Sequence, residues 1–151
     1  MNKPFSEVKE MTLEVPANSG LSGSVSLQVQ DNSGGEARVL DLNEPWRVRV
    51  RIEWEDQFNL LVNTSFEAHL FVESMGPGPE VHLGSGTVTV TGTGVYNVDI
   101  NVGPNQPQFN GPPAISSLYK VVTVVEHKNN ANAETIIAGF AEAPAIHLRN
   151  P

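Results

Sequence analysis

The 151-residue chain contains no cysteine. This absence excludes disulfide bonds, thiolate nucleophiles, zinc–thiolate sites and iron–sulfur clusters. A chain of this length is the usual size of one domain, and it buries roughly 68–70% of its unfolded surface without needing a covalent staple. We therefore expect a single domain over residues 1–151 with its own hydrophobic core.

Positive charge and long apolar runs are also scarce. Nine Lys and Arg stand against 17 Asp and Glu, a formal net charge of −8, which argues against general nucleic-acid binding. No uninterrupted apolar stretch approaches the ~18 residues of a membrane span. The opening "MNKPFSEVKEMTLEV" has no apolar run after its first Lys, unlike a secretory signal. We expect a cytoplasmic location, with release as part of a larger particle as the alternative.

Short motifs of common enzymes are missing. The sequence contains no GxSxG nucleophile elbow, HExxH metal motif, Walker loop or GxGxxG after a strand. A chain of short strands also leaves little material for a walled active site. We therefore expect no catalytic residues and no cofactor. A glycosidase-like carboxylate pair stays open, because residues distant in the chain can meet only in the fold.

Apolar residues recur with a period of two along most of the chain, which indicates strands with one buried face. The stretch "PWRVRVRIEWE" at 45–55 alternates almost without error. Turn-forming Gly, Pro and Asn separate such runs. Strands are predicted at 7–15 (weaker than the rest), 23–30, 45–55, 64–74, 86–94, 95–103, 118–127 and 134–149.

Seven to nine strands without helical crossovers favour an all-β fold, a single antiparallel two-sheet β-sandwich. The arrangement resembles immunoglobulin-like or fibronectin-like domains in architecture only, since the chain has no Cys…Trp…Cys spacing. A jelly roll is the main rival. The Pro-rich connection 103–117 is interpreted as a sheet-to-sheet crossover rather than a functional loop.

The stretch 45–55 places three of the five arginines of the chain, Arg47, Arg49 and Arg51, on its outward face. If 45–55 and 64–74 form a hairpin, Arg51 pairs with Glu67, or Arg47 pairs with Glu73. Such neutralisation explains the arginines without a ligand. The alternative is an anion-binding stripe for carboxylate, sulfate or phosphate, because successive outward side chains lie ~6.6 Å apart.

The stretch "VVTVV" in strand 118–127 is apolar on both faces. Tyr119, Val121 and Val125 form one set, and Leu118, Val122 and Val124 form the other. A sandwich buries one face of each sheet, so leaving the second set in water costs about 1.5–3 kcal/mol per side chain relative to burial. Either a loop of the chain covers it, namely 56–63 or 103–117, or another molecule does. The candidate interface residues are Leu118, Val122, Val124, Ile137, Phe71, Phe58, Leu60 and Leu61.

No metal site is predicted. Glu67 with His69, and Glu80 with His82, are i, i+2 pairs of the kind that metals use, but nothing in the sequence brings them together. The segment "DNSGGE" at 31–36 offers oxygens yet lacks the spacing of an EF-hand loop, so a hairpin turn is expected.

These features favour a non-catalytic β-sandwich with a structural or protein–protein interaction role, a subunit of a homo-oligomer or larger assembly. The expected partner is therefore protein, with no nucleic acid and no membrane span. The alternative is a carbohydrate- or anion-binding module. A small enzyme is the least favoured class.

Overall fold

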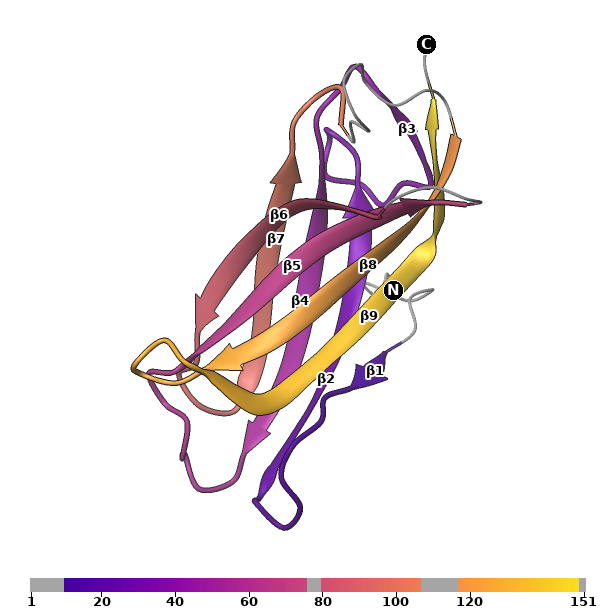
Figure 1. Ribbon diagram of the computed structural model, residues 1–151. Coiled ribbons are helices and arrows are strands. Elements are labelled where there is room, and N and C mark those ends of the chain that lie inside the picture. Colours follow the sequence, from indigo (N-terminus) through magenta and orange to yellow (C-terminus); the bar gives the residue numbers. More distant parts are fainter. Residues whose placement is uncertain (1–9, 76–79, 107–116, 150–151) are drawn as a thin grey trace, which may run out of the picture.

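The computed structural model describes residues 10–75, 80–106 and 117–149. Within these ranges the chain forms nine strands and no helix (Figure 1). The strands are β1 (Met11–Thr12), β2 (Leu21–Gln30), β3 (Val39–Asp41), β4 (Trp46–Asp56), β5 (Ser65–Ser74), β6 (Glu80–Thr89), β7 (Gly94–Val102), β8 (Ser117–Lys128) and β9 (Glu134–Arg149). None of the described residues belongs to a helix long and apolar enough to cross a membrane.

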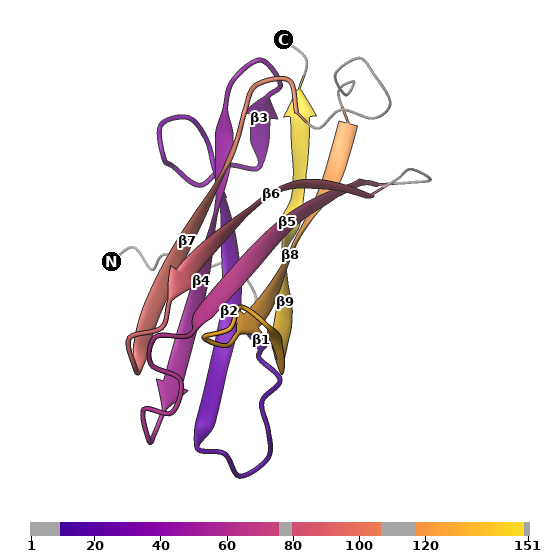
Figure 2. The ribbon, with the colours of Figure 1, turned by 60° about the vertical axis from the view of Figure 1, so that its left-hand side comes forward.

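The strands form two sheets that pack face to face (Figures 1 and 2). Sheet A has the order β1-β2-β4-β7, and sheet B has the order β3-β9-β8-β5-β6. The all-β, two-sheet prediction is confirmed. The prediction that every pairing is antiparallel is wrong, because β3 runs parallel to β9. The sequence pattern missed β3, whose three residues are too few to establish a period.

The core lies between the sheets and follows the predicted alternation. In β4 every second residue from Trp46 to Trp54 is at most 3% exposed. In β5 the inward set from Phe66 to Val72 is fully buried. The rings of Trp54 and Phe66 meet edge to face between the layers, with centroids 5.1 Å apart. Aromatic pairs of this geometry stabilise a core beyond the area that they bury.

The predicted hairpin between 45–55 and 64–74 is wrong. β4 pairs with β2 and β7 in sheet A, whereas β5 pairs with β6 and β8 in sheet B. The chain therefore changes sheet after β4, in the connection 57–64. It changes sheet again between β7 and β8, which confirms that 103–117 is a crossover. Residues 107–116 of that connection lie outside the described part.

A buried carboxylate organises the connection after β4. Asp56 is 2% exposed, and its two oxygens accept the backbone N–H groups of Leu60 and Leu61, each at 2.8 Å. Leu61 packs against the core, whereas Phe58 and Leu60 are 63% and 59% exposed. The connection thus closes one end of the sandwich with Leu61 and leaves two of the candidate interface residues in solvent.

Candidate functional site

The three arginines of β4 lie on the outer face of sheet A, as predicted, but their partners are not those predicted. Arg49 faces Asp99 of β7 and donates to it through Nε (2.8 Å) and Nη2 (3.0 Å). Arg47 donates through Nε to Gln30, and Arg51 lies 2.9 Å from a carboxylate oxygen of Glu53. The hairpin partners Glu67 and Glu73 lie in the other sheet.

The arrangement on sheet A uses the guanidinium groups within the protein. The hydrogen bond from Arg49 lowers the pKa of the Asp99 carboxyl, and the same bond raises the pKa of Arg49. A bidentate pair occupies both the charge and the planar fork with which Arg recognises anions. Each of the three arginines thus has a polar partner within the protein. This geometry does not favour the anion-binding interpretation of Arg47, Arg49 and Arg51.

Two open hollows lie along sheet A. One, of about 410 Å³, is bounded by the turn Asp31–Gly34, by Pro45–Arg47 and by Asn101–Gly103. The other, of about 520 Å³, lies over Ser22–Ser24, Glu53–Glu55 and Thr93–Val95. Among the described residues that line them, the aromatic ones are Trp46 and Trp54, which are buried in the core. The described lining of both hollows therefore contains no exposed ring.

The turn at one of these hollows is the predicted hairpin-type turn. Oδ1 of Asp31 accepts the N–H and hydroxyl of Ser33, at 2.9 and 2.6 Å, and the N–H of Gly35 at 3.2 Å. These bonds, led by the one from the Ser33 hydroxyl, lower the pKa of Asp31. The turn thus uses one of the two carboxylate oxygens of Asp31, Oδ1, for its own hydrogen bonds.

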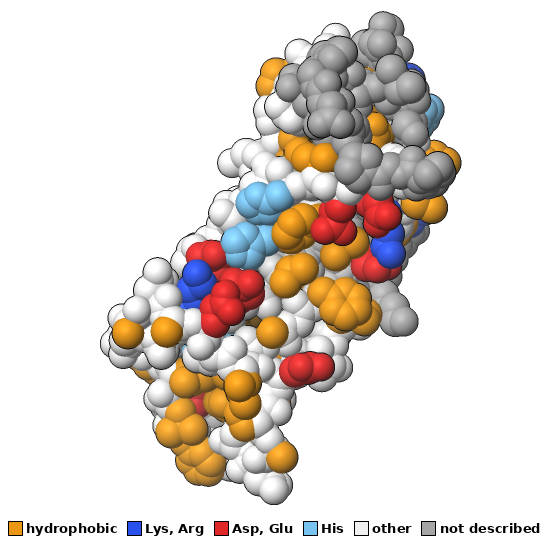
Figure 3. Space-filling model, in the orientation of Figure 1, with side chains coloured by type: hydrophobic (Ala, Val, Ile, Leu, Met, Phe, Trp, Pro, Cys, Tyr) orange, Lys and Arg blue, Asp and Glu red, His pale blue; other side chains and the backbone are white. Residues whose placement is uncertain are grey.

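The outer face of sheet B has a different character (Figure 3). Apolar and histidine side chains occupy its centre, and carboxylates lie toward both ends (Figure 3). The face is built from alternate residues of four adjacent strands. We define it as Glu67, His69, Phe71 and Glu73 of β5, His82 of β6, Lys120, Val122, Val124, Glu126 and Lys128 of β8, and Phe140 and Glu142 of β9.

Most candidate interface residues of the strands lie on this side of sheet B. Leu118 is 51% exposed, and Phe71, Val122 and Val124 are half-buried. The prediction that Ile137 lies at the surface is wrong, because its side chain is 4% exposed and belongs to the core. Its neighbour Ile136 is the exposed one, at 73%. The error arose because a pair of adjacent apolar residues does not say which of the two points inward.

A β-bulge adds an aromatic group that the sequence did not place. The β5–β6 register shifts between Leu70 and Phe71, so that Leu70 pairs with Gly84 but Phe71 pairs with His82. The extra residue turns His82 outward, with its ring 5.1 Å from that of Phe71 and 5.4 Å from that of His69. Bulges commonly re-aim side chains beside functional sites.

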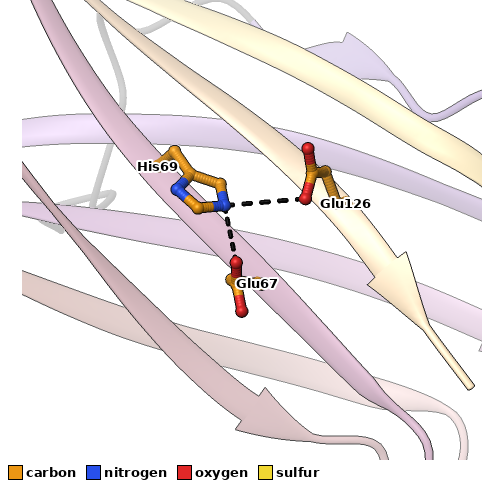
Figure 4. A group of neighbouring side chains, drawn as sticks. All are labelled: Glu67, His69 and Glu126. Atoms are coloured by element: carbon orange, nitrogen blue, oxygen red, sulfur yellow. Dashed lines mark ion pairs between the residues drawn. The ribbon is translucent and has the colours of Figure 1, made fainter. Parts of the chain in front are cut away.

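Ionisable side chains of β5, β6 and β8 converge on this face, beside the ring of Phe71. Nε2 of His69 lies 2.7 Å from Oε1 of Glu67 and 3.6 Å from Oε2 of Glu126 (Figure 4). Nδ1 of His69 lies 3.3 Å from Nε2 of His82. Lys128 lies 3.5 Å from Glu67 and completes the cluster. The structure therefore joins the Glu67–His69 pair to His82, and adds Glu126 from the adjacent strand β8.

Cross-strand register explains why sequence reasoning missed this cluster. Glu67 lies opposite Glu126 across β5 and β8, and His82 reaches the cluster only through the bulge. Both relationships depend on which strands are neighbours, which the alternation of one strand does not encode. The alternation in each strand did place Glu67, His69 and Glu126 at outward-facing positions. This was the signal in the sequence that could have pointed to the cluster.

The remaining histidine network is internal. His127 is 1% exposed, with Nδ1 2.8 Å from the Thr135 hydroxyl and Nε2 2.8 Å from the Thr64 hydroxyl. Burial lowers the pKa of His127. The Thr64 hydroxyl donates its own hydrogen to the carbonyl of Leu61. Its oxygen therefore accepts a hydrogen bond from the Nε2–H group of His127. The ring is held neutral, as a structural link between β8, β9 and the connection after β4.

Comparisons with known proteins bear on the fold. No protein family model matches the chain, and no curated protein matches its sequence. The C-terminal domain of wzt matches with a TM-score of 0.56 and 10% identity, over 97% of this chain and 79% of that one. A β-glucosidase from Listeria innocua, solved in complex with glucose, matches with a TM-score of 0.52 and 9% identity. That match covers 85% of this chain but only 16% of the β-glucosidase.

These likenesses show the fold alone, because sequence identity is so low. A family 9 carbohydrate-binding module from Caldicellulosiruptor kristjanssonii, in complex with cellotriose, also aligns over 97% of this chain and 85% of its own length. Its identity is 10% and its TM-score is 0.37. The fold is thus shared with the C-terminal domain of wzt and with a portion of the β-glucosidase.

Proposed function

We propose that the chain is a non-catalytic binding module that holds carbohydrate on the outer face of sheet B. The observation that carries the proposal is the grouping of exposed and half-buried rings beside carboxylates on one sheet face. Phe71, Phe140, His69 and His82 provide the rings, and Glu67 and Glu126 adjoin them. This proposal takes up the alternative expected from sequence rather than the assembly role.

The chemistry of the face suits a sugar ring. The C–H side of a pyranose is apolar and packs on aromatic carbons, while its hydroxyls donate to carboxylates and exchange hydrogen bonds with imidazoles. Phe140 is 48% exposed, so its ring is available for stacking. It lies in register with Val124 and His69 across β9, β8 and β5. One row across the sheet thus offers an aromatic ring at one end and a hydrogen-bonding ring at the other.

Among the described residues, the hollows on sheet A lack the exposed aromatic rings found on the outer face of sheet B, and this difference supports sheet B as the binding face. They contain carboxylates and hydroxyls but no exposed aromatic side chain. The ligand class is inferred from the side chains of sheet B, since the β-glucosidase solved with glucose shares the fold alone.

A second copy of the chain is the other candidate occupant of this face. The observation that favours it is the continuous apolar strip of Val122, Val124 and Phe140, with Leu118 beyond it at 51% exposure. Exposed apolar strips on β-sheets are common association surfaces. In this second proposal the chain is a subunit of a homo-oligomer, the role that the sequence favoured first.

A glycan array followed by calorimetric titration of each positive glycan tests the carbohydrate proposal. We expect Phe140→Ala and Phe71→Ala to weaken binding at least tenfold. The control is Phe58→Ala, which removes an exposed ring from the connection after β4 and leaves the affinity unchanged. Absence of any bound glycan, or an equal loss in the control, would overturn the proposal.

Light scattering over a concentration series tests the second copy. We expect Val122→Thr with Val124→Thr to lower the mass of any oligomer while leaving the circular dichroism spectrum unchanged. A single monomeric species up to high concentration would exclude self-association. Because the glycan array is read at low protein concentration, the two tests are independent.

A further inference from the structure

We propose that Glu67, His69 and Glu126 form a binding site for one divalent transition-metal ion of the zinc type. The three ligand atoms come from neighbouring strands and lie within 4.8 Å of one another. Each side chain is partly exposed, from 23% to 31%, so an ion can reach the site from solvent. This inference goes beyond the carbohydrate proposal and does not depend on it.

The distances are close to those of a tetrahedral ion. Ligands at about 2.0–2.2 Å from zinc stand about 3.4 Å apart at a tetrahedral angle. The 3.6 Å between His69 Nε2 and Glu126 Oε2 already meets that spacing. The 2.7 Å between His69 Nε2 and Glu67 Oε1 is an ion-pair contact shorter than that spacing, so the two atoms must move apart when an ion binds between them. A small rotation of Glu67 is then sufficient.

His82 determines which nitrogen of His69 is free to bind. When Nε2 of His69 carries the ion, the single proton of the neutral imidazole is on Nδ1, and this N–H donates to Nε2 of His82, 3.3 Å away. Partners of this kind fix the tautomer and orientation of a ligating imidazole. The bulge at Leu70 and Phe71, which turns His82 outward, is thereby part of the site.

Charge also favours a cation at this position. Glu67 and Glu126 face each other across β5 and β8, and side by side such carboxylates repel. Lys128, 3.5 Å from Glu67, supplies one compensating charge, and a divalent ion supplies two. Mixed imidazole and carboxylate ligands select zinc-like ions over magnesium and calcium, which prefer oxygen alone. Three protein ligands leave the fourth position for water.

Calorimetric titration of chelator-treated, tag-free protein with ZnCl₂ tests the site. We expect one zinc ion per chain, lost in His69→Ala and in Glu126→Gln. His82→Gln should weaken binding about 10–100-fold. The matched controls are Glu73→Gln, a carboxylate on the same face of β5, and His147→Gln, a histidine of β9; both should bind as the parent does.

Two results would overturn the proposal: no saturable binding by the parent chain, or equal binding by the parent, His69→Ala and Glu126→Gln. The circular dichroism spectrum of each variant checks folding, and if His69→Ala unfolds, Glu126→Gln carries the test. X-ray absorption of the zinc complex provides a second readout. One imidazole in the coordination shell supports the ligand set, whereas two or none would contradict it.

Discussion

Arg49 of β4 and Asp99 of β7 stand directly opposite each other and form a two-pronged ion pair, with N···O distances of 2.8 and 3.0 Å. Their side chains are 34% and 33% exposed, so water screens the attraction. Exposed pairs of this kind stabilise proteins by about 0.2–1 kcal/mol. A double-mutant cycle of Arg49→Ala and Asp99→Ala, measured by urea denaturation, should give a coupling energy in that range.

The same pair predicts a pH effect. Because the pKa of Asp99 is lowered in the folded protein, its stabilisation is present above the unfolded pKa of about 3.9. It is lost as the pH falls through the lower folded value. The difference in unfolding free energy between the parent and Asp99→Asn should therefore shrink between pH 5 and pH 2 (about the range in which such carboxyls titrate). A constant difference would contradict the assignment.

Acid should also destabilise the protein through His127. Burial lowers the pKa of this histidine below its ordinary value of about 6.5, so at acid pH the unfolded chain binds a proton that the folded chain does not. Stability is retained above about pH 6.5 and decreases as the pH falls below it. Thermal melts across this range should show a decrease in melting temperature that His127→Gln reduces.

Loss of the Asp56 carboxylate should loosen one end of the sandwich. Asp56→Ala leaves the N–H groups of Leu60 and Leu61 without their acceptors, and each such bond to a charged group contributes about 1.5–3 kcal/mol. We expect a loss of at least that much unfolding free energy in a urea titration. The neighbouring, exposed Glu55→Ala should change it by less than about 0.5 kcal/mol.

A methyl group at Gly23 should not fit. An added Cβ would lie 2.8 Å from the backbone oxygen of Glu53 and 2.9 Å from Cε3 of Trp54. Overpacking of this kind costs about 1–3 kcal/mol, so Gly23→Ala should lower the melting temperature. Gly103, where a Cβ meets no atom within 4 Å, provides the control. Equal melting temperatures for both variants would contradict the packing described for β2 and β4.

The faces of the strands could be predicted from sequence, but their neighbours could not. The period of two in β4 assigned Val48 and Val50 inward and Arg49 outward, and the structure agrees. The pattern could not show whether Arg49 would face β5 or β7. The alternation within one strand fits any neighbouring strand and any register that keeps the apolar residues on the inner face. The prediction therefore gave Arg49 the correct environment, the outer face of a sheet, but the wrong partner strand.

For the candidate site, too, the outward-facing positions could be predicted from sequence, but the contacts between strands could not. The two-sided apolar pattern of β8 placed Val122 and Val124 on an outer face, which the structure confirms. The meeting of His69 with His82 depends on a bulge, and a single inserted residue leaves only a short interruption in the alternation. The predicted strand at 86–94 left out Glu80–Ser85, which belong to β6, and His82 was considered only as a partner of Glu80.

The long strand β9 has β8 along one side, but on its other side it has only brief partners. Glu14 bridges to Ala138, and β3 runs beside His147–Arg149. Between these contacts, where no described strand is paired, stands Pro144. Proline has no N–H to donate and is a recognised guard against strand addition. Pro144 therefore offers no backbone N–H to a neighbouring strand at that position of sheet B.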